Sequence, residues 1–176
     1  MSDGRDGGPP DSGGSKGTDA PDDPAAITPE RDRLLLDVML GTLASYLRMC
    51  GYDALYALDD GVEDDDAIRT LAAIEGRRLV TRDRDLAAST PGALLLTERD
   101  VVEQLRELRT AGVRLRLDGQ PSRCGACNAP VERVADGGRR PEYAPDDGPL
   151  WRCVDCGQHF WRGSHWDDVA ETLASL

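Results

Sequence analysis

The chain has 176 residues and a formal net charge of −12, with 33 acidic side chains against 21 lysines and arginines. An acidic surface repels nucleic acid at long range, which argues against a binder that depends on electrostatics alone but not against an enzyme that uses divalent cations as a bridge. The simplest interpretation of the charge is a well-solvated surface, as in proteins adapted to high salt. No apolar run of membrane-spanning length and no apolar signal segment are present, so a cytoplasmic location and no membrane partner are expected.

The composition divides the chain into four parts. Residues 1–30 are rich in Gly, Pro, Ser and Asp and poor in large apolar side chains, so they are predicted to be a disordered acidic tail. Residues 33–112 have the pattern of an α/β domain, and residues 113–121 are predicted to be a linker. Residues 122–176 contain four of the five cysteines and are predicted to form a small zinc ribbon with a closing helix.

Short apolar runs alternate with helical periodicity in the predicted α/β domain. Strands are expected over residues 34–38, 54–58, 78–81 and 93–96, and helices over residues 40–50, 64–75 and 101–111. This alternation predicts a parallel sheet with right-handed crossovers. The carboxyl ends of all strands would then lie at one edge, which is where open α/β sheets bind ligands.

The cysteines of the C-terminal part form two Cys-x-x-Cys pairs. Cys124 and Cys127 make the first pair, and Cys153 and Cys156 make the second. In a reducing compartment such pairs indicate metal ligands rather than disulfides. A two-residue spacer lets one tight turn direct both thiolates at one ion, and two such turns complete the tetrahedron that Zn²⁺ prefers. Because four thiolates leave no open coordination position, the predicted zinc is structural.

Aspartates stand where the predicted strands end and where a helix begins. Asp37 ends the first strand, Asp65 starts a helix, and Asp83 and Asp85 follow the third strand. In a parallel sheet they can meet at one edge. Crowded carboxylates stay ionised together only beside a cation, and hard oxygen ligands favour Mg²⁺ or Mn²⁺. Such an ion lowers the pKa of bound water and neutralises phosphodiester charge, so the pattern suits a metal-dependent nuclease.

The same aspartates have structural explanations. Acids at residues 64–66 favour a helix start, and Asp83 or Asp85 could cap the short helix that follows them. An aspartate at a strand end also suits a phosphoacceptor domain, and the acid pattern partly fits a topoisomerase-primase fold. The spacing alone does not decide among these roles.

Three segments carry a joint signature. Residues 36–53 contain LDVMLGTLA and YLRMCGYD, residues 65–86 contain DDAI and EGRRLVTRDRDL, and WRGSHW at residues 161–166 follows the second cysteine pair. Together with the cysteine pairs, these segments resemble the Mut-seven C-terminal RNase family, in which a PIN-like domain precedes a zinc ribbon. The resemblance covers residues 34–166. It implies a PIN-like three-layer α/β fold with a mostly parallel sheet, and a metal-dependent ribonuclease activity.

The resemblance also implies roles for the acids. Asp37, Asp65 and Asp83 are expected to hold Mg²⁺ or Mn²⁺ for the hydrolysis of RNA phosphodiester bonds, with Asp85 assisting. Thr81 is a candidate for orienting a metal-bound water.

Basic and aromatic side chains are the expected RNA contacts. Arg48, Arg82 and Arg84 are candidates for phosphate binding, because guanidinium pairs bidentately with phosphate, or else for surface ion pairs. On the ribbon, RNA contacts are expected from Arg123, Arg162, His165 and Trp166. The competing hypothesis is a non-catalytic zinc-ribbon module that binds RNA or a protein partner, in which the acids are solvated or structural.

Overall fold

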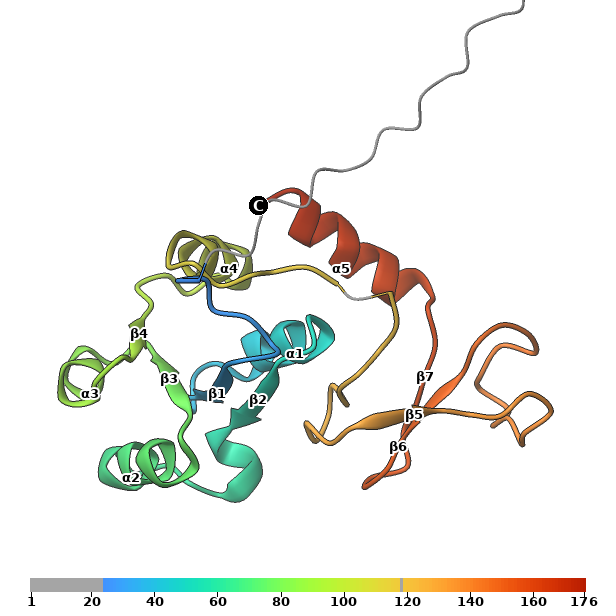
Figure 1. The fold of residues 1–176 in the computed structure, drawn as a ribbon, viewed down its shortest axis with the longest axis horizontal. Helices are drawn as coiled ribbons and strands as arrows, with labels where there is room; N and C mark the ends of the chain where they lie inside the picture. The colour runs from blue at the N-terminus through green and yellow to red at the C-terminus, as the bar shows by residue number, and fades with distance from the viewer. Residues whose placement is uncertain (1–23, 118) are drawn as a thin grey trace, which may run out of the picture.

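A computed structural model describes residues 24–117 and 119–176 (Figure 1). The elements are β1 (Arg33–Leu36), α1 (Gly41–Met49), β2 (Asp53–Tyr56), the 3₁₀ helix η1 (Ala57–Asp60), α2 (Asp65–Glu75), β3 (Arg78–Thr81), α3 (Arg84–Ser89), β4 (Leu94–Leu95), α4 (Val101–Thr110), β5 (Val131–Arg133), β6 (Trp151–Cys153), β7 (His159–Phe160) and α5 (Ser164–Ala174). The helices and strands expected in the α/β part are all present. The disorder predicted for residues 1–23 lies outside the described residues. None of the helices in the described ranges is long and apolar enough to cross a membrane.

The first four strands form one parallel sheet in the order β2-β1-β3-β4. In the centre, Leu35 of β1 aligns with Leu55 of β2 on one side and with Leu79 of β3 on the other. The chain therefore moves outward from β1 to β2 and then crosses back to β3. The carboxyl ends of β1 and β3 mark this reversal, which is the place where open parallel sheets bind ligands.

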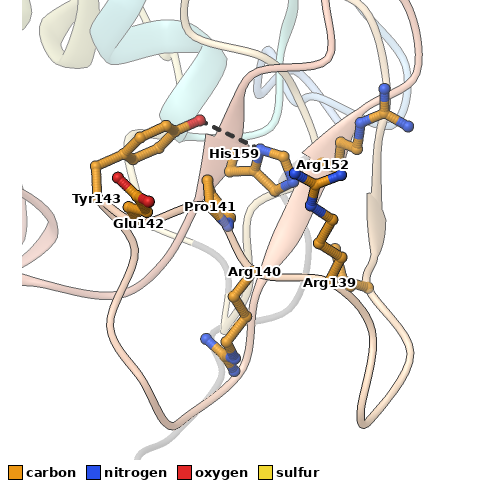
Figure 2. A pocket seen from close by; sticks show the side chains of 8 residues that line it. Arg139, Arg140, Pro141, Glu142, Tyr143, Arg152 and His159 are labelled. Atoms are coloured by element: carbon orange, nitrogen blue, oxygen red, sulfur yellow. Dashed lines mark hydrogen bonds between the residues drawn. The ribbon is translucent and has the colours of Figure 1, made fainter.

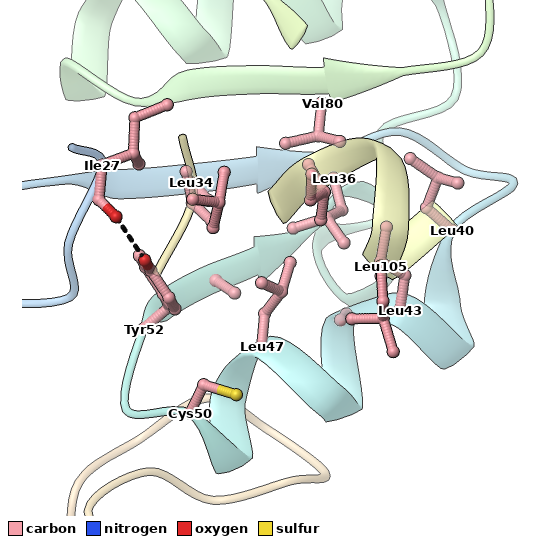
Figure 3. Packing of buried hydrophobic residues seen from close by; sticks show 14 of the residues in the cluster. Ile27, Leu34, Leu36, Leu40, Leu43, Leu47, Cys50, Tyr52, Val80 and Leu105 are labelled. Carbon is pink, nitrogen blue, oxygen red and sulfur yellow. Dashed lines mark hydrogen bonds between the residues drawn. The ribbon is translucent and has the colours of Figure 1, made fainter. Parts of the chain in front are cut away.

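Helices cover both faces of the sheet and give three layers (Figure 1). Leu34 and Leu36 of β1 pack in the same cluster as residues of α1, α4 and α5, a part of which is drawn in Figure 3. Leu35, which points to the other face, packs with residues of α2 and α3. All three leucines are completely buried, which stabilises the fold by about 1.5–3 kcal/mol each. The predicted three-layer α/β fold with a parallel sheet is confirmed.

Two segments outside the predicted α/β domain complete its core. Ile27 is buried, forms a parallel bridge with Val113, and accepts a hydrogen bond of 2.7 Å from the Tyr52 hydroxyl (Figure 3). Residues 24–30 belong to the predicted disordered tail, and in the structure the Ile27 side chain and its backbone bonds attach this segment to the core. At the other end, Val169 and Leu173 of α5 pack in the same cluster, so the closing helix joins the α/β core rather than the ribbon.

The C-terminal part contains a small antiparallel sheet in the order β5-β6-β7, with the first cysteine pair in the turn before β5 and the second at the end of β6 and in the turn that follows it. The first turn, residues 124–128, is the first knuckle. Its Cys124 carbonyl accepts from the Asn128 N–H at 3.0 Å. Asn128 has a φ of 65°, and Gly157 has a φ of 76° after the second pair. Asparagine and glycine tolerate this left-handed conformation best, so both turns close without much strain.

The first knuckle docks on the open edge of the parallel sheet. Asn128 accepts a hydrogen bond from the Ala54 N–H of β2 at 2.9 Å and donates to the Asp53 carboxylate at 2.7 Å. The Ala54 carbonyl accepts from the Arg48 Nε at 2.9 Å. Ala54 is completely buried, and its N–H and carbonyl groups are thus hydrogen-bonded by side chains rather than by another strand. The docked knuckle blocks this stretch of edge against pairing with another chain.

The structure replaces the predicted role of Arg48. Its side chain is 3% exposed, and Nη1 donates to the carbonyls of Gly125 and Ala126 in the first knuckle, at 3.0 and 3.2 Å. Nη2 pairs with Asp59 at 2.7 Å. A guanidinium that is buried and bonded in this way cannot serve as a phosphate contact. It joins α1, β2 and η1 to the ribbon instead.

Three arginines surround the carboxylate of Asp53 at the start of β2. Its carboxylate pairs with Arg77 at 2.7 Å and with Arg33 at 3.1 Å, and Arg123 lies 3.8 Å away. Burial alone would raise the pKa of Asp53, but hydrogen bonds from Arg77 and Asn128 and the charge of Arg77 outweigh it and lower the pKa to about 2. Asp53 is therefore a structural anion that orders the seam between sheet and ribbon.

The low pKa of Asp53 predicts a defined pH dependence of stability. The folded-state pKa is below the unfolded value of about 3.9, so the stabilisation is present above pH 4 and is lost as the pH falls towards 2. Its full size is about 2 kcal/mol, and about half is lost by pH 3. Urea unfolding of wild type and Asp53→Asn at pH 7 and pH 3 measures it, because the effect of acid on the cysteines is common to both proteins. A difference in unfolding free energy that is the same at both pH values would contradict this prediction.

Two substitutions at Asn128 distinguish the energy of the docking contact from the energy of the left-handed backbone in the knuckle. Asn128→Gly keeps the left-handed backbone accessible but leaves the buried Ala54 N–H without an acceptor, so the free energy of unfolding should fall by about 1–3 kcal/mol. Asn128→Ala should cost more, because it adds backbone strain. Zinc content should stay at the wild-type level in Asn128→Gly. A glycine variant as stable as wild type in urea would show that the contact contributes nothing.

Candidate functional site

The four paired cysteines converge in the ribbon. The Sγ atoms of Cys124, Cys127, Cys153 and Cys156 all lie within 4.8 Å of one another. Between the two pairs, the Sγ atoms of Cys124 and Cys156 are 3.7 Å apart and those of Cys127 and Cys153 are 3.5 Å apart. A tetrahedral zinc ion with Zn–S bonds near 2.3 Å requires sulfur atoms about 3.8 Å apart, so the four thiols fit this ion.

The pKa values of these thiols differ, and they bear on how the cluster would bind a cation. Burial raises the pKa of Cys124 to about 12. Burial would also raise the pKa of Cys153, but hydrogen bonds from the N–H groups of Cys156 and Asp155 outweigh it and lower the pKa to about 7. Thiolates are the ligands that zinc binds, so binding would release protons from the cluster.

At the carboxyl edge of the parallel sheet, one hydroxyl connects two of the predicted acids. Asp37 follows β1 and is 3% exposed. Its Oδ2 accepts from the Thr81 hydroxyl at 2.7 Å, and its Oδ1 accepts from the Val38 N–H at 2.6 Å. The same Thr81 oxygen accepts from the Asp83 N–H at 2.9 Å. Thr81 therefore fixes Asp37 against the start of the β3–α3 turn, which differs from the predicted role of orienting a water.

The two carboxylate oxygens of Asp83 have different surroundings. One carboxylate oxygen caps α3 by accepting from the N–H groups of Asp85 and Leu86, each at 2.8 Å. The other oxygen has no hydrogen-bond donor in the described part of the chain. The predicted capping role is thus present, and an oxygen remains that could bind a cation. Asp85 is exposed in the first turn of α3.

Asp65 reaches the same edge from the first residue of α2. Partial loss of solvent raises its pKa, as do the negative charges of Asp83 and Asp37, and then those of its neighbours Asp64 and Asp66. Asp65 thus feels the other two predicted ligands as like charges. Such repulsion is what a bound divalent cation relieves.

The carboxylates do not close into a tight site by themselves. In the part of the chain that the structure describes, the cysteine cluster is the one group of three or more His, Cys, Asp or Glu side chains close enough to hold a metal ion. The acids share an edge and carry hard oxygen donors, which suits Mg²⁺ or Mn²⁺ in kind.

The other predicted phosphate contacts lie beside this edge. Arg82 is half-buried between Thr81 and Asp83, and its Nε is buried without a hydrogen-bond partner among the described residues. Arg84 is exposed at the start of α3.

Three of the four predicted RNA contacts of the ribbon line a groove of about 470 Å³ between α1 and the ribbon, and Arg162 does not. Arg123, His165 and Trp166 line it, together with residues of the first knuckle. His165 is exposed, whereas Trp166 is 7% exposed and has the Arg162 guanidinium 5.9 Å above its ring. Trp166 is therefore mainly a packing residue, and His165 offers the more accessible surface.

Tyr56 is a neighbour of the acidic edge that the sequence analysis missed. Its hydroxyl donates to the Val38 carbonyl at 2.7 Å, directly after Asp37. Burial and the charges of Asp59 and Asp37 raise its pKa. A Cβ at Gly41 would lie 3.1 Å from the Tyr56 ring, so a larger residue where α1 begins would require the ring to shift by a few tenths of an ångström. The available signal was the position of Tyr56 within the strand predicted over residues 54–58.

The comparisons with known proteins agree with this architecture. A protein-family model, described as the Mut7-C RNAse domain, matches residues 32–173, which span both the aspartate edge and the cysteine cluster. Neither the curated proteins nor the solved structures contain a match. Because the family match covers well over half of the chain, the resemblance seen in the sequence is confirmed, and the chain belongs to the Mut7-C RNAse domain family.

Proposed function

We propose that the protein is a metal-dependent ribonuclease whose reaction takes place at the carboxyl edge of the parallel sheet. The observation that supports the proposal is the link that the Thr81 hydroxyl makes between Asp37 and Asp83 at the point where the strand order reverses, with Asp65 close enough to feel the charges of both. Membership of the Mut7-C RNAse domain family supports RNA as the substrate class.

Asp37, Asp65 and Asp83 would hold one or two Mg²⁺ or Mn²⁺ ions. When bound, the cation supplies a water of lowered pKa and positive charge opposite the phosphodiester. Among the described residues, each oxygen of Asp37 accepts one hydrogen bond, so each retains a lone pair for a metal.

Neighbouring residues hold the acids in position at this edge of the sheet. Thr81 holds the Asp37 carboxylate in one rotamer, and the cap that Asp83 makes on α3 fixes its position. Arg82 and Arg84 are placed beside the acids, where they would contact the phosphates that flank the cleaved bond. Asp85 would assist from the first turn of α3. The four cysteines would hold a structural zinc, and the ribbon would bind RNA through Arg162 and His165.

The test of catalysis is the substitution Asp37→Asn. It removes one ligand charge with little change in shape, and RNA cleavage with Mn²⁺ should fall by at least about a hundredfold. Cleavage of end-labelled single-stranded RNA, followed on denaturing gels, measures the rate. Asp60→Asn makes the same chemical change at an exposed position in η1 and should leave the rate near that of wild type.

The opposite result would support the non-catalytic module. If wild type and Asp37→Asn both bind the RNA and both leave it intact with Mn²⁺ and with Mg²⁺, the nuclease proposal fails. Equal cleavage by both proteins would place the reaction elsewhere.

Thr81 gives a second test, as a positioning residue. Thr81→Val keeps the branched shape but loses the hydroxyl between Asp37 and Asp83, so cleavage should fall about 10- to 100-fold. The Mn²⁺ concentration for half-maximal activity should also rise, because Asp37 would no longer be held. Thr81→Ser keeps the hydroxyl and should restore most of the activity and the wild-type Mn²⁺ requirement. A valine variant with an unchanged Mn²⁺ requirement would exclude this positioning role.

A further inference from the structure

The ribbon has a hollow whose charge is opposite to that of the chain. Its volume is about 700 Å³, and it lies between the loop of residues 139–143 and the strands β6 and β7 (Figure 2). Three arginines and one glutamate line it, in a protein with a net charge of −12. A concave surface with locally positive charge favours an anionic ligand.

Two of the three arginines have unused donors. The side chains of Arg139 and Arg152 make no hydrogen bond or ion pair with any residue in the two described ranges, although Glu132 lies opposite Arg152 in the sheet. Arg140 differs, because it donates to the carbonyls of Pro145, at 2.7 Å, and Gly148. Arg140 therefore shapes the loop, whereas the guanidinium groups of Arg139 and of Arg152, the latter beside Gly157, keep donors that can bind oxyanions.

An exposed aromatic ring stands beside these arginines. Tyr143 is 65% exposed, and its hydroxyl lies 3.3 Å from the Nδ1 of His159 (Figure 2). The Tyr143 ring centroid is 6.3 Å from those of His159 and Trp161. These contacts hold the ring in one place while much of its surface stays open to solvent. A preordered aromatic surface beside arginines is the arrangement with which proteins bind single-stranded nucleic acid.

The hollow also adjoins the groove described above. His159 lines both, so the two depressions adjoin across β7, and His165 lies in the second. A bound strand could therefore extend from one into the other.

We propose that this hollow binds two successive backbone phosphates of single-stranded RNA, one through Arg139 and the other through Arg152, while Tyr143 stacks on the adjoining base. The proposal rests on RNA as the substrate class of the proposed ribonuclease. An acidic peptide could also pair with the arginines, but it has no flat base for the exposed ring, so the observations favour RNA.

The test measures binding apart from cleavage. Zinc-loaded full-length Asp37→Asn protein is titrated into a fluorescein-labelled single-stranded 12-nucleotide RNA without added Mg²⁺ or Mn²⁺, and Kd is obtained from anisotropy at several salt concentrations. Adding Arg139→Gln and Arg152→Gln should raise Kd about tenfold. The slope of log K against log salt should fall in magnitude by about 1.4, since each arginine that no longer neutralises a phosphate lowers it by about 0.7.

A matched control makes the same charge change elsewhere. Arg99→Gln with Arg109→Gln removes two exposed arginines at the two ends of α4 and should change Kd by less than about twofold. Because Arg152 adjoins Cys153, Arg139→Gln is also measured alone. It lies outside the zinc-binding turns and should produce about half of the change in slope. Zinc content and circular dichroism check that each variant is folded.

Substitutions at Tyr143 measure the contribution of base stacking to RNA binding without changing the charge. Tyr143→Ala should raise Kd about fivefold or more, whereas Tyr143→Phe, which keeps the ring, should bind like the parent protein.

Three results would overturn the proposal. The first is a Kd and salt slope of Arg139→Gln that equal those of the control. The second is equal binding by Tyr143→Ala and Tyr143→Phe. The third is displacement of the RNA by polyglutamate as readily as by unlabelled RNA of equal charge, which would identify an acidic peptide as the ligand. A failure of Mn²⁺-dependent cleavage would leave all these binding outcomes intact, so the two proposals fail separately.

Discussion

The buried guanidinium of Arg48 is the contact on which the arrangement of the two units depends. Four residues of β2 leave one edge of the parallel sheet unpaired, and at Ala54 that edge is completely buried. An unsatisfied backbone group in such a place costs about 1–3 kcal/mol. Arg48 satisfies the carbonyl of Ala54 and, with the same guanidinium, two carbonyls of the first knuckle. The ribbon is therefore held by polar groups that the sheet needs to satisfy, in addition to the apolar packing of α5.

The same sheet topology explains the position of the acids. Because the strand order reverses between β1 and β3, the crossovers that follow these two strands lead away in opposite directions, and the ends of the strands lie at a point where open sheets bind ligands. Asp37 is nevertheless 3% exposed, and a buried carboxylate is stable only when its oxygens are bonded. Thr81 and the Val38 N–H provide those bonds. The Asp83 cap shows that a helix-capping role and a ligand role are compatible, since the cap uses one of the two carboxylate oxygens.

Much of this was predictable from the sequence because it depends on local rules. Apolar periodicity located the strands and helices, the parallel topology brought Asp37 and Asp83 to one edge, and the cysteine spacing predicted the zinc cluster. The role of Arg48 was not predictable in this way. An arginine on an amphipathic helix is normally expected to be exposed to solvent. Its burial depends on a contact with Gly125, which lies 77 residues further along the chain. Ile27 was missed for a similar reason: an isolated apolar residue in a polar tail carries no periodicity.

The distribution of charge gives the two units different relations to RNA. The acidic edge repels a phosphodiester unless a divalent cation lies between them, whereas the arginines and the exposed tyrosine of the ribbon need no cation. If both proposals hold, the ribbon retains RNA whether or not Mg²⁺ or Mn²⁺ is bound, and the cation controls only the approach of the phosphate to the aspartates. Because the net charge of −12 weakens long-range attraction, retention must come from contacts at short range. A rigid connection between the two units then matters, since a substrate held on the ribbon reaches the aspartates only along a fixed path, and the contacts of Arg48 and Asn128 provide that connection.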